Sequence, residues 1–307
     1  MTLEELHRLS PYSLDKTAKE ANMLEGLSAL TEHHRQHCPA YGRMLQAMGY
    51  REQTAETIAA IPFIPVRMFK EYELLSIPRE AVVKTMTSSG TSGQQVSRIF
   101  LSKENVRSQT KTLTAIITDY IGKQRLPLLL LDTELVKKDR SMFSARGAGI
   151  IGFTTFGRDV CYALDEKMQI DIPRVLEFIE KHKNSPILLF GYTYMIWQFT
   201  VRALEEAGIS LPIHAGILFH IGGWKKLKDQ AVSAEEYSRR VNSVLGGNVQ
   251  IHNYYGMAEQ LGSVFVECEH GHMHCSNYSD VIIRRPWDFS VAEKGERGCL
   301  LYTSRCV

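Results

Sequence analysis

The sequence has little excess charge of either sign. Its 307 residues include 36 Lys and Arg against 34 Asp and Glu, which gives a formal net charge of +2. This near balance excludes a protein that binds nucleic acid through bulk positive charge, because such a protein needs a strongly basic surface. The chain also has only 10 prolines and is 44% hydrophobic. That composition excludes disordered and fibrous proteins and indicates an ordinary globular chain.

Long apolar runs are absent as well. The first 21 residues mix acidic and basic side chains without the apolar core of a signal peptide, and no later run reaches the length of a membrane span. The six cysteines, at positions 38, 161, 268, 275, 299 and 306, are irregularly spaced, which disfavours a disulfide framework. We therefore expect a cytoplasmic protein with no membrane span.

The pattern that is present changes character along the chain. Residues 13–37 have the leucine spacing of a helix, with Ser13 as its cap, and two prolines in the apolar run 61–70 indicate an extended connector. From Val82 onward, strand-like runs alternate with helical ones. Strands are predicted at 81–86, 96–101, 126–131, 186–190, 215–221, 249–255 and 263–267, and helices at 103–121 and 225–245. This alternation predicts an α/β fold with a largely parallel sheet.

We expect the last nine residues to differ in origin from the rest. Residues 299–307, CLLYTSRCV, match the translation of a transposon end used to build sequencing libraries, followed by its inverted copy. The next codon of that copy is a stop. We interpret 299–307 as a non-native tail, with a natural exposed strand as the alternative.

A hydroxyl-rich glycine loop is the sharpest chemical signal. It runs from Thr87 to Gly93, TSSGTSG, between two predicted strands. Glycines let the backbone turn tightly and expose its N–H groups, and the hydroxyls add donors, so such a loop can surround a phosphate. It lacks the Lys-Ser/Thr ending of a Walker A motif, which disfavours a P-loop NTPase. By itself, the loop is equally typical of a flexible Gly/Ser turn.

Four stretches together resemble the adenylate-forming enzymes, and most closely the acyl-protein synthetases of the luminescence-type fatty-acid reductase complex, which are related to phenylacetate-CoA ligases. They are IPFIPVRMFKEYELLS (61–76), SSGTSGQQVSRIF (88–100), HIGGWKKL (220–227) and HNYYGMAEQ (252–260). The resemblance implies the large N-terminal domain of such an enzyme, with stacked sheet and helix layers and a helical N-terminal segment. We expect three regions: 1–80, helical segment and connector; 81–298, adenylate-forming core, truncated before the small C-terminal domain; and the tail 299–307.

The resemblance also implies a set of nucleotide-binding residues. The loop that surrounds the ATP phosphates would be Ser88, Ser89, Gly90, Thr91, Ser92 and Gly93, with Thr91 in a catalytic role. Gly222, Gly223 and Trp224 would line the adenine and acyl pockets. Tyr254, Tyr255, Gly256 and Met257 would hold the adenine, which suits an aromatic ring that stacks on a base.

Glu259 matches the family glutamate that holds Mg²⁺, an oxygen ligand for a hard cation that bridges phosphates. The sequence departs from the family at Ala258, where many relatives carry Thr or Ser that bonds the adenylate phosphate. Loss of one such hydrogen bond costs on the order of 1–3 kcal/mol. It would weaken catalysis without excluding it.

The implied reaction is ATP-dependent activation of a carboxylic acid, a fatty acid by the resemblance, to acyl-AMP, followed by transfer to a protein cysteine of a partner acyl reductase. The alternatives are an aryl- or fatty-acyl-CoA ligase, in which CoA is the acceptor thiol, and a nucleotide-binding partner protein without turnover. The family's ribose-binding aspartate, catalytic lysine and acceptor cysteine are not found before Gly298. We therefore expect these residues alone to turn over poorly.

A second cluster offers ligands for Zn²⁺. Cys268, His270, His272, His274 and Cys275 lie within eight residues, but their spacing is not that of a standard zinc finger. A polar hairpin around a buried cysteine explains the same residues equally well.

Overall fold

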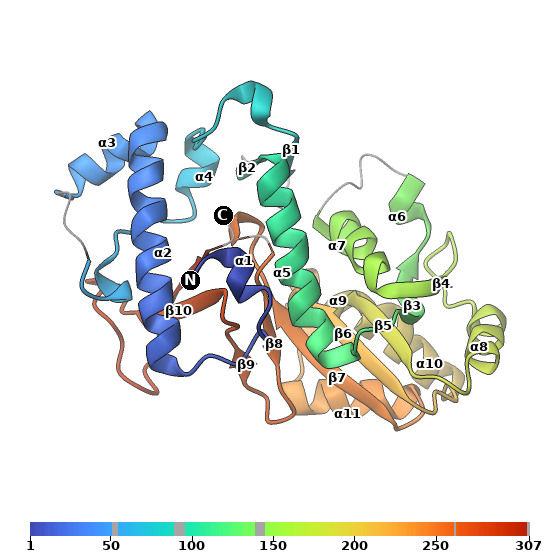
Figure 1. The fold of residues 1–307 in the computed structure, drawn as a ribbon. Helices are drawn as coiled ribbons and strands as arrows, with labels where there is room; N and C mark the ends of the chain where they lie inside the picture. The colour runs from blue at the N-terminus through green and yellow to red at the C-terminus, as the bar shows by residue number, and fades with distance from the viewer. Residues whose placement is uncertain (51–54, 89–95, 139–144, 261, 306–307) are drawn as a thin grey trace. The chain divides into compact units, whose positions relative to one another are not determined.

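The structure is a computed structural model, and it describes residues 1–50, 55–88, 96–138, 145–260 and 262–305. The chain divides into two compact units. The first unit comprises Met1–Asp119, Gly256–Phe265 and Cys275–Val307, and the second comprises Tyr120–Tyr255 and Val266–His274. Each unit therefore combines segments that are far apart in the sequence (Figure 1).

The second unit is built on a seven-stranded sheet. Its strand order is β4 (Gly157–Leu164), β3 (Leu126–Thr133), β5 (Ile187–Tyr192), β6 (Gly216–Ile221), β7 (Val249–Tyr255), β8 (Phe265–Glu267) and β9 (Met273–His274). The pairs from β4 to β7 are parallel, and β8 pairs with β9 antiparallel. The predicted α/β fold with a largely parallel sheet is confirmed.

Helices cover both faces of this sheet (Figure 1). They are α6 (Leu135–Lys138), α7 (Ala145–Phe153), α8 (Ile172–Lys181), α9 (Thr193–Ile196), α10 (Arg202–Ala207) and α11 (Ala234–Val244). The single helix predicted for 225–245 is wrong. A short 3₁₀ helix, η6 (Lys225–Gln230), precedes α11, because Ala231 is extended and the Ser233 hydroxyl accepts a hydrogen bond from the Glu236 N–H at 3.1 Å and begins a new helix.

Burial on both faces explains the unbroken apolar run of β3. Leu129 and Leu131 belong to the core cluster that contains α8, α10 and α11 side chains such as Val175, Leu204 and Val241. On the opposite face, Phe153 of α7 stacks on Phe190 of β5 with ring centroids 4.0 Å apart. Parallel strands that are covered on both faces need apolar residues at every position rather than at alternate ones.

The first unit contains helices and two antiparallel hairpins. Its elements are α1 (Leu3–Leu6), α2 (Lys16–His37), α3 (Pro39–Ala47), η1 (Ile58–Ala60), α4 (Met68–Glu71), η2 (Arg79–Ala81), β1 (Lys84–Thr87), β2 (Arg98–Leu101), α5 (Lys103–Ile121, which runs into the second unit), η7 (Ala258–Gln260), β10 (Ser279–Arg284) and β11 (Cys299–Ser304). The predicted cap of the first long helix is wrong. Asp15 caps α2 by accepting the Ala18 N–H at 2.8 Å, whereas the Ser13 hydroxyl donates to the Ser10 carbonyl.

The N-terminal segment is tied to residues near 277. The Asn277 side-chain amide donates to the Ser10 carbonyl at 2.8 Å, and its backbone N–H donates to the Pro11 carbonyl at 2.6 Å. The helical segment predicted for 1–80 thus shares one unit with residues from the other end of the chain.

The stretch predicted to be non-native forms a strand. β11 pairs antiparallel with β10 over six positions, from Ser279↔Ser304 to Arg284↔Cys299. Tyr302 of β11 is 6% exposed, and its hydroxyl donates to the Ser263 carbonyl. The non-native origin of 299–307 stays a prediction.

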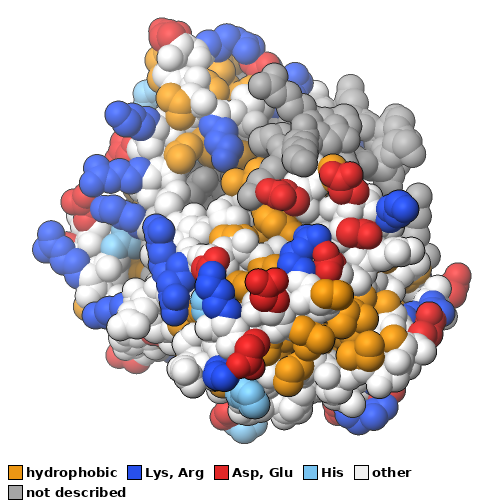
Figure 2. Space-filling model, turned by 90° about the vertical axis from the view of Figure 1, so that its right-hand side faces the viewer, with side chains coloured by type: hydrophobic (Ala, Val, Ile, Leu, Met, Phe, Trp, Pro, Cys, Tyr) orange, Lys and Arg blue, Asp and Glu red, His pale blue; other side chains and the backbone are white. Residues whose placement is uncertain are grey.

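Within the described ranges, no helix combines the length and the apolar character that a membrane span requires. Figure 2 shows basic and acidic side chains distributed together over one face, with a group of hydrophobic side chains beside them. This mixture on the visible face fits the near balance of charge in the sequence.

Candidate functional site

The base of the glycine loop is a closed hairpin. β1 pairs antiparallel with β2, with Thr87 opposite Arg98, which confirms the two strands predicted on either side of the loop. The Ser88 N–H donates to the Ser97 carbonyl at 3.2 Å, and the Ser97 N–H donates to the Ser88 hydroxyl at 3.0 Å. The predicted phosphate-binding residues Ser89, Gly90, Thr91, Ser92 and Gly93 lie outside the described residues. Their role stays a prediction.

Glu259 lies in the same unit as this hairpin. It belongs to η7, and only 7% of its surface is exposed. None of the ion pairs among the described residues includes it. A buried carboxylate without a compensating cation is costly, so this position suits a metal ligand, and the Mg²⁺ role of Glu259 stays a prediction.

Two contacts position the segment around Glu259 against β2 and α5. Strand β2, which follows the loop, contacts η7. Just after η7, Gly262 has φ +89°, and a Cβ there would lie 2.6 Å from the Cα of Gln109 in α5. Only glycine allows this close approach, which holds the segment after Glu259 against α5.

Several polar atoms near these elements lack partners. Ser97 Oγ, Gln109 Nε2 and Gln260 Oε1 are buried, and no described residue hydrogen-bonds to them. Buried polar atoms without partners are rare and point to a ligand or to water. They come from the loop base, α5 and η7, the same three elements that position Glu259.

Gly256 and Met257 lead from β7 into η7, and the two predicted adenine-binding tyrosines end β7 in the second unit. Tyr254 is only 8% exposed and lies near the rings of Phe153 and Phe190, with centroids 6.3 and 6.2 Å away. This burial raises the pKa of Tyr254 well above its ordinary value. Tyr255 is 39% exposed, so it is the ring of this pair that is accessible to a base.

The glycines after β6 allow a tight turn over a tyrosine. Gly222 has φ +82°, and a Cβ at this position would lie 3.3 Å from the Tyr192 ring. Trp224 is half-buried, and its ring packs edge-on against Trp197 with centroids 5.1 Å apart. Trp224 therefore anchors this turn to the core of the second unit, and Gly223 stays exposed between the two.

A buried ion pair at the end of β3 was not predicted. Asp132 is fully buried and accepts two hydrogen bonds from the Arg146 guanidinium of α7, one of them from Nε at 2.8 Å. The Thr133 N–H donates to the same carboxylate at 2.7 Å. The acid directly after the apolar run 126–131 could have revealed this position, because side chains at the carboxyl ends of parallel strands line ligand sites.

Lys225 adds a second cation at this edge of the sheet. Its ammonium lies 4.9 Å from the Tyr194 ring centroid and 5.6 Å from that of Tyr192, in cation–π geometry. Burial, and then the charge of Arg146, lower the pKa of Lys225. Because Asp132 already pairs with Arg146, the cluster keeps one net positive charge, which can hold an anion.

The proposed Zn²⁺ ligands do not converge. Among the described residues, no group of three or more His, Cys, Asp or Glu side chains is placed to hold a metal ion. His270, His272 and His274 are exposed, and Cys268 Sγ accepts the His270 N–H at 3.4 Å. This is the geometry of the alternative, a polar hairpin, with Cys275 half-buried beside it in the sequence.

Comparison with known proteins assigns the family. A family model described as acyl-protein synthetase, LuxE, matches residues 7–306. The chain belongs to this family of acyl-protein synthetases. Among curated relatives, it is 25% identical over 253 residues to the long-chain-fatty-acid–luciferin-component ligase of Vibrio harveyi. That alignment covers 78% of this chain and 63% of the relative, so the chain spans less than two thirds of the relative's length.

Solved structures show the same fold for this acyl-protein synthetase family member. An open conformation of 2-hydroxyisobutyryl-CoA ligase, bound to its acyl adenylate and CoA, has a TM-score of 0.71 at 14% identity and covers 96% of this chain and 63% of that chain. A long-chain-fatty-acid-CoA ligase from Archaeoglobus fulgidus has a TM-score of 0.52 at 13% identity, with 75% of this chain and 43% of that chain covered. The predicted fold of an adenylate-forming enzyme's large domain is confirmed.

Proposed function

We propose that the chain carries the adenylating site of an acyl-protein synthetase, which converts a fatty acid to acyl-AMP and passes the acyl group to a thiol. A carboxylate oxygen attacks the α-phosphorus of ATP, and the bond to pyrophosphate breaks. The thiol sulfur then attacks the acyl carbon, and AMP leaves. The observation that carries this proposal is buried Glu259, which has no described cation partner and lies on an element in contact with β2 beside the glycine loop.

Different residues would bind the nucleotide and neutralise the charge of its phosphates. Glu259 would hold Mg²⁺, which supplies positive charge against the phosphate oxygens. Ser88 and the loop residues to Gly93, including Thr91, would bind the phosphates through N–H and hydroxyl groups. Tyr255, with Gly256 and Met257, would hold the adenine, and Lys225 would attract an anionic group of the substrate. No side-chain nucleophile is needed, because this half of the reaction depends on positioning and electrostatics.

The acceptor and the location belong to the same proposal. Membership of the acyl-protein synthetase family favours a protein cysteine of an acyl reductase over CoA. We place the reaction in the cytoplasm, where ATP and reduced thiols are both present.

The decisive substitution is Glu259→Gln, which keeps the shape of the side chain and removes its charge. We expect acid-dependent pyrophosphate release from MgATP to fall on the order of 100-fold, because one centre of charge stabilisation is lost. Stoichiometric protein and a library of carboxylic acids allow even one turnover to be detected. The matched control is Glu269→Gln, at a carboxylate that is 85% exposed, and it should release pyrophosphate as the parent does.

The alternatives give different results. If MgATP binds but no acid triggers pyrophosphate release, the chain is a nucleotide-binding protein without turnover. If acyl-AMP forms and CoA discharges it faster than a protein thiol does, the chain is an acyl-CoA ligase. Unchanged release in Glu259→Gln would reject the role of Glu259.

A further inference from the structure

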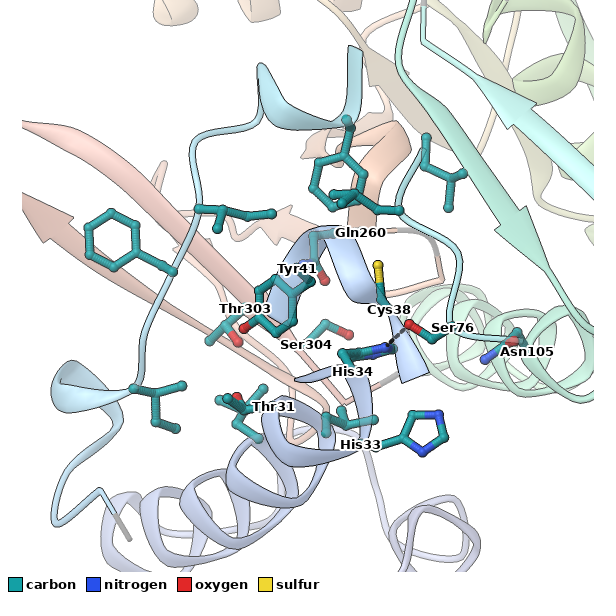
Figure 3. Close-up of a pocket in the computed structure, with 18 of the residues that line it drawn as sticks. Thr31, His33, His34, Cys38, Tyr41, Ser76, Asn105, Gln260, Thr303 and Ser304 are labelled. Carbon is teal, nitrogen blue, oxygen red and sulfur yellow. Dashed lines mark hydrogen bonds between the residues drawn. The ribbon is translucent and has the colours of Figure 1, made fainter. Parts of the chain in front are cut away.

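An apolar cavity of about 510 Å³ lies within the first unit. Its walls come from α2, α3, the connector 58–77, β2, the start of α5, η7 with Gln260, and the β10–β11 hairpin (Figure 3). His34 of α2 and Ser76 of the connector form a hydrogen bond of 2.7 Å in these walls. β11 adds four wall residues from the stretch predicted to be non-native, Leu301, Tyr302, Thr303 and Ser304. Because this wall depends on the origin of 299–307, we assign the cavity no ligand.

In the second unit, a buried hydrogen-bond network holds the turn after β6. The Thr193 hydroxyl lies 2.8 Å from the Gly222 carbonyl and 2.9 Å from His220 Nδ1. Thr193 begins α9 directly after β5, and His220 belongs to β6. Each of these two side chains is only 6% exposed. The network therefore joins the ends of two neighbouring parallel strands inside the protein.

The direction of these hydrogen bonds follows from what each group can donate. Burial, and then the charge of His252, lower the pKa of His220 to about 3, so its ring is neutral at pH 7 and has one N–H. The Gly222 carbonyl can only accept, so the Thr193 hydroxyl donates its proton to this oxygen. We therefore assign the ring proton of His220 to Nδ1, which donates to the Thr193 oxygen. The Ile221 carbonyl lies farther from the hydroxyl, at 3.3 Å.

Tyr237 of α11 packs against both the network and the turn. Its ring centroid lies 4.7 Å from that of His220 and 6.0 Å from that of Trp224, which follows the two glycines of the turn. Tyr237 is 3% exposed. Because close packing restricts rotation of the His220 ring, its Nδ1 stays directed at Thr193.

The turn lies beside the proposed adenine site. Ile221 pairs with Tyr254 across β6 and β7. The next residues, Gly222 and exposed Tyr255, therefore lie at the same level of the sheet, at the carboxyl ends of parallel strands, where ligands of α/β proteins bind. Gly222 has φ +82° and Lys225 has φ +47°, a conformation that residues other than glycine rarely adopt. Such a backbone persists only where its surroundings hold it, and the Thr193 network does so at the Gly222 carbonyl.

We propose that Thr193, oriented by His220, is a positioning residue for the nucleotide, because it holds the Gly222–Trp224 turn in the shape that binds the adenine of ATP beside Tyr255. The inference rests on the proposed function and adds two buried residues that touch no substrate. The adenine takes no part in the bonds that break and form. A loosened turn should therefore weaken ATP binding without slowing the reaction of bound ATP.

Thr193→Val tests the hydroxyl, because valine keeps the shape of the side chain and cannot donate. We expect the Kd for MgATP, and the ATP concentration for half-maximal pyrophosphate release, to rise about tenfold, as for one lost hydrogen bond. The maximal rate should change less than about twofold. Competition with a fluorescent ATP analogue measures the Kd, and single-turnover release with a fatty acid measures the rate. A lower maximal rate with an unchanged Kd would overturn the proposal.

Two further threonine variants separate positioning from folding. Thr193→Ser restores the donor and should keep the Kd for MgATP within about twofold of the parent value. Thr200→Val, on the helical segment that continues α9, removes a fully buried hydroxyl that has no partner among the described residues. This matched control should bind MgATP as the parent does. If Thr193→Ser binds MgATP as weakly as Thr193→Val, the hydroxyl does not hold the turn and the proposal is rejected.

His220→Phe tests the other half of the network, because phenylalanine keeps an aromatic ring and loses the N–H. We expect it to weaken MgATP binding about threefold. The double variant His220→Phe/Thr193→Val should lose no more affinity than Thr193→Val alone, because His220 acts through the Thr193 hydroxyl. Losses that multiply in the double variant would overturn the role of His220.

The two proposals can fail separately. If pyrophosphate release depends on Glu259 but Thr193→Val leaves the Kd for MgATP unchanged, the positioning role is rejected and the proposed function stands. If Thr193→Val weakens MgATP binding as described but no acid triggers pyrophosphate release, the proposed function fails and the positioning role stands.

Discussion

Two buried carboxylates differ in what balances their charge. Asp132 accepts hydrogen bonds from Arg146 and from the Thr133 N–H, so its charge is compensated inside the protein. Glu259 is buried to 7% exposure without a described cation partner. Because burial of a charge is costly unless it is paired, the ion pair with Arg146 stabilises buried Asp132, whereas a metal at Glu259 stays a prediction.

Asp132→Asn tests the structural ion pair. The amide cannot neutralise Arg146, which would stay buried with an uncompensated charge, so we expect the free energy of unfolding to fall by about 3–5 kcal/mol. Urea denaturation measures this loss. The double variant Asp132→Leu/Arg146→Met removes both charges and should recover most of the stability. A double variant as unstable as the single one would show that packing, rather than charge, is at stake.

At the scale of elements, the sequence predicts the bounds of those helices and strands whose hydrophobic periodicity and end residues are clear. Helix 103–121 and strand 249–255 were predicted at their observed bounds, Lys103–Ile121 and Val249–Tyr255. The prediction of one helix across 225–245 is wrong because the Ser233 side chain caps a separate helix there. The β10–β11 pair depends on a partner strand from the predicted tail, and no pattern within β10 announces that pairing.

Deletion of 299–307 tests this dependence. It removes the partner strand of β10 and the buried Tyr302, and loss of a buried aromatic side chain alone costs about 3–5 kcal/mol. We expect the amides of Ser279–Arg284 to exchange with deuterium at least tenfold faster, while those of Gly216–Ile221 keep their protection. Hydrogen exchange read by mass spectrometry measures both. Equal protection of Ser279–Arg284 in the two proteins would mean that β11 contributes no stability.

At the scale of the whole molecule, each unit contains a neutral histidine ring, half-buried His34 in the first and buried His220 in the second. In the first unit, burial lowers the pKa of His34 to about 4. In the second, burial and then the charge of His252 lower the pKa of His220 to about 3, and the ring bonds to the Thr193 hydroxyl at 2.9 Å. Both values lie below the ordinary value of 6.5, so the unfolded chain binds protons more readily than the folded one.

Acid should therefore destabilise both units. The stability due to these neutral rings is complete above about pH 6.5 and is lost as the pH falls toward 4, by up to about 1.4 kcal/mol per pH unit for each histidine. Urea denaturation at several values between pH 7 and 5 measures the slope. His34→Gln should reduce the slope of the free energy of unfolding against pH by the contribution of one histidine. Exposed His270→Gln should leave that slope unchanged. An identical slope in His34→Gln would contradict the assignment.

The sequence by itself determined the α/β class, the strand–loop–strand around Ser88 and the membership of an adenylate-forming family. These follow from periodicity, glycine placement and short motifs, which are local properties of the chain. Only the tertiary structure decided that Arg146 reaches Asp132, that Tyr254 is buried while Tyr255 is accessible, and that Gln260 meets the connector around an apolar cavity. Some of these features join residues that are distant in sequence. Others distinguish neighbours, such as Tyr254 and Tyr255, that look alike in the sequence. Burial and pairing of this kind depend on how elements pack, which no local pattern encodes.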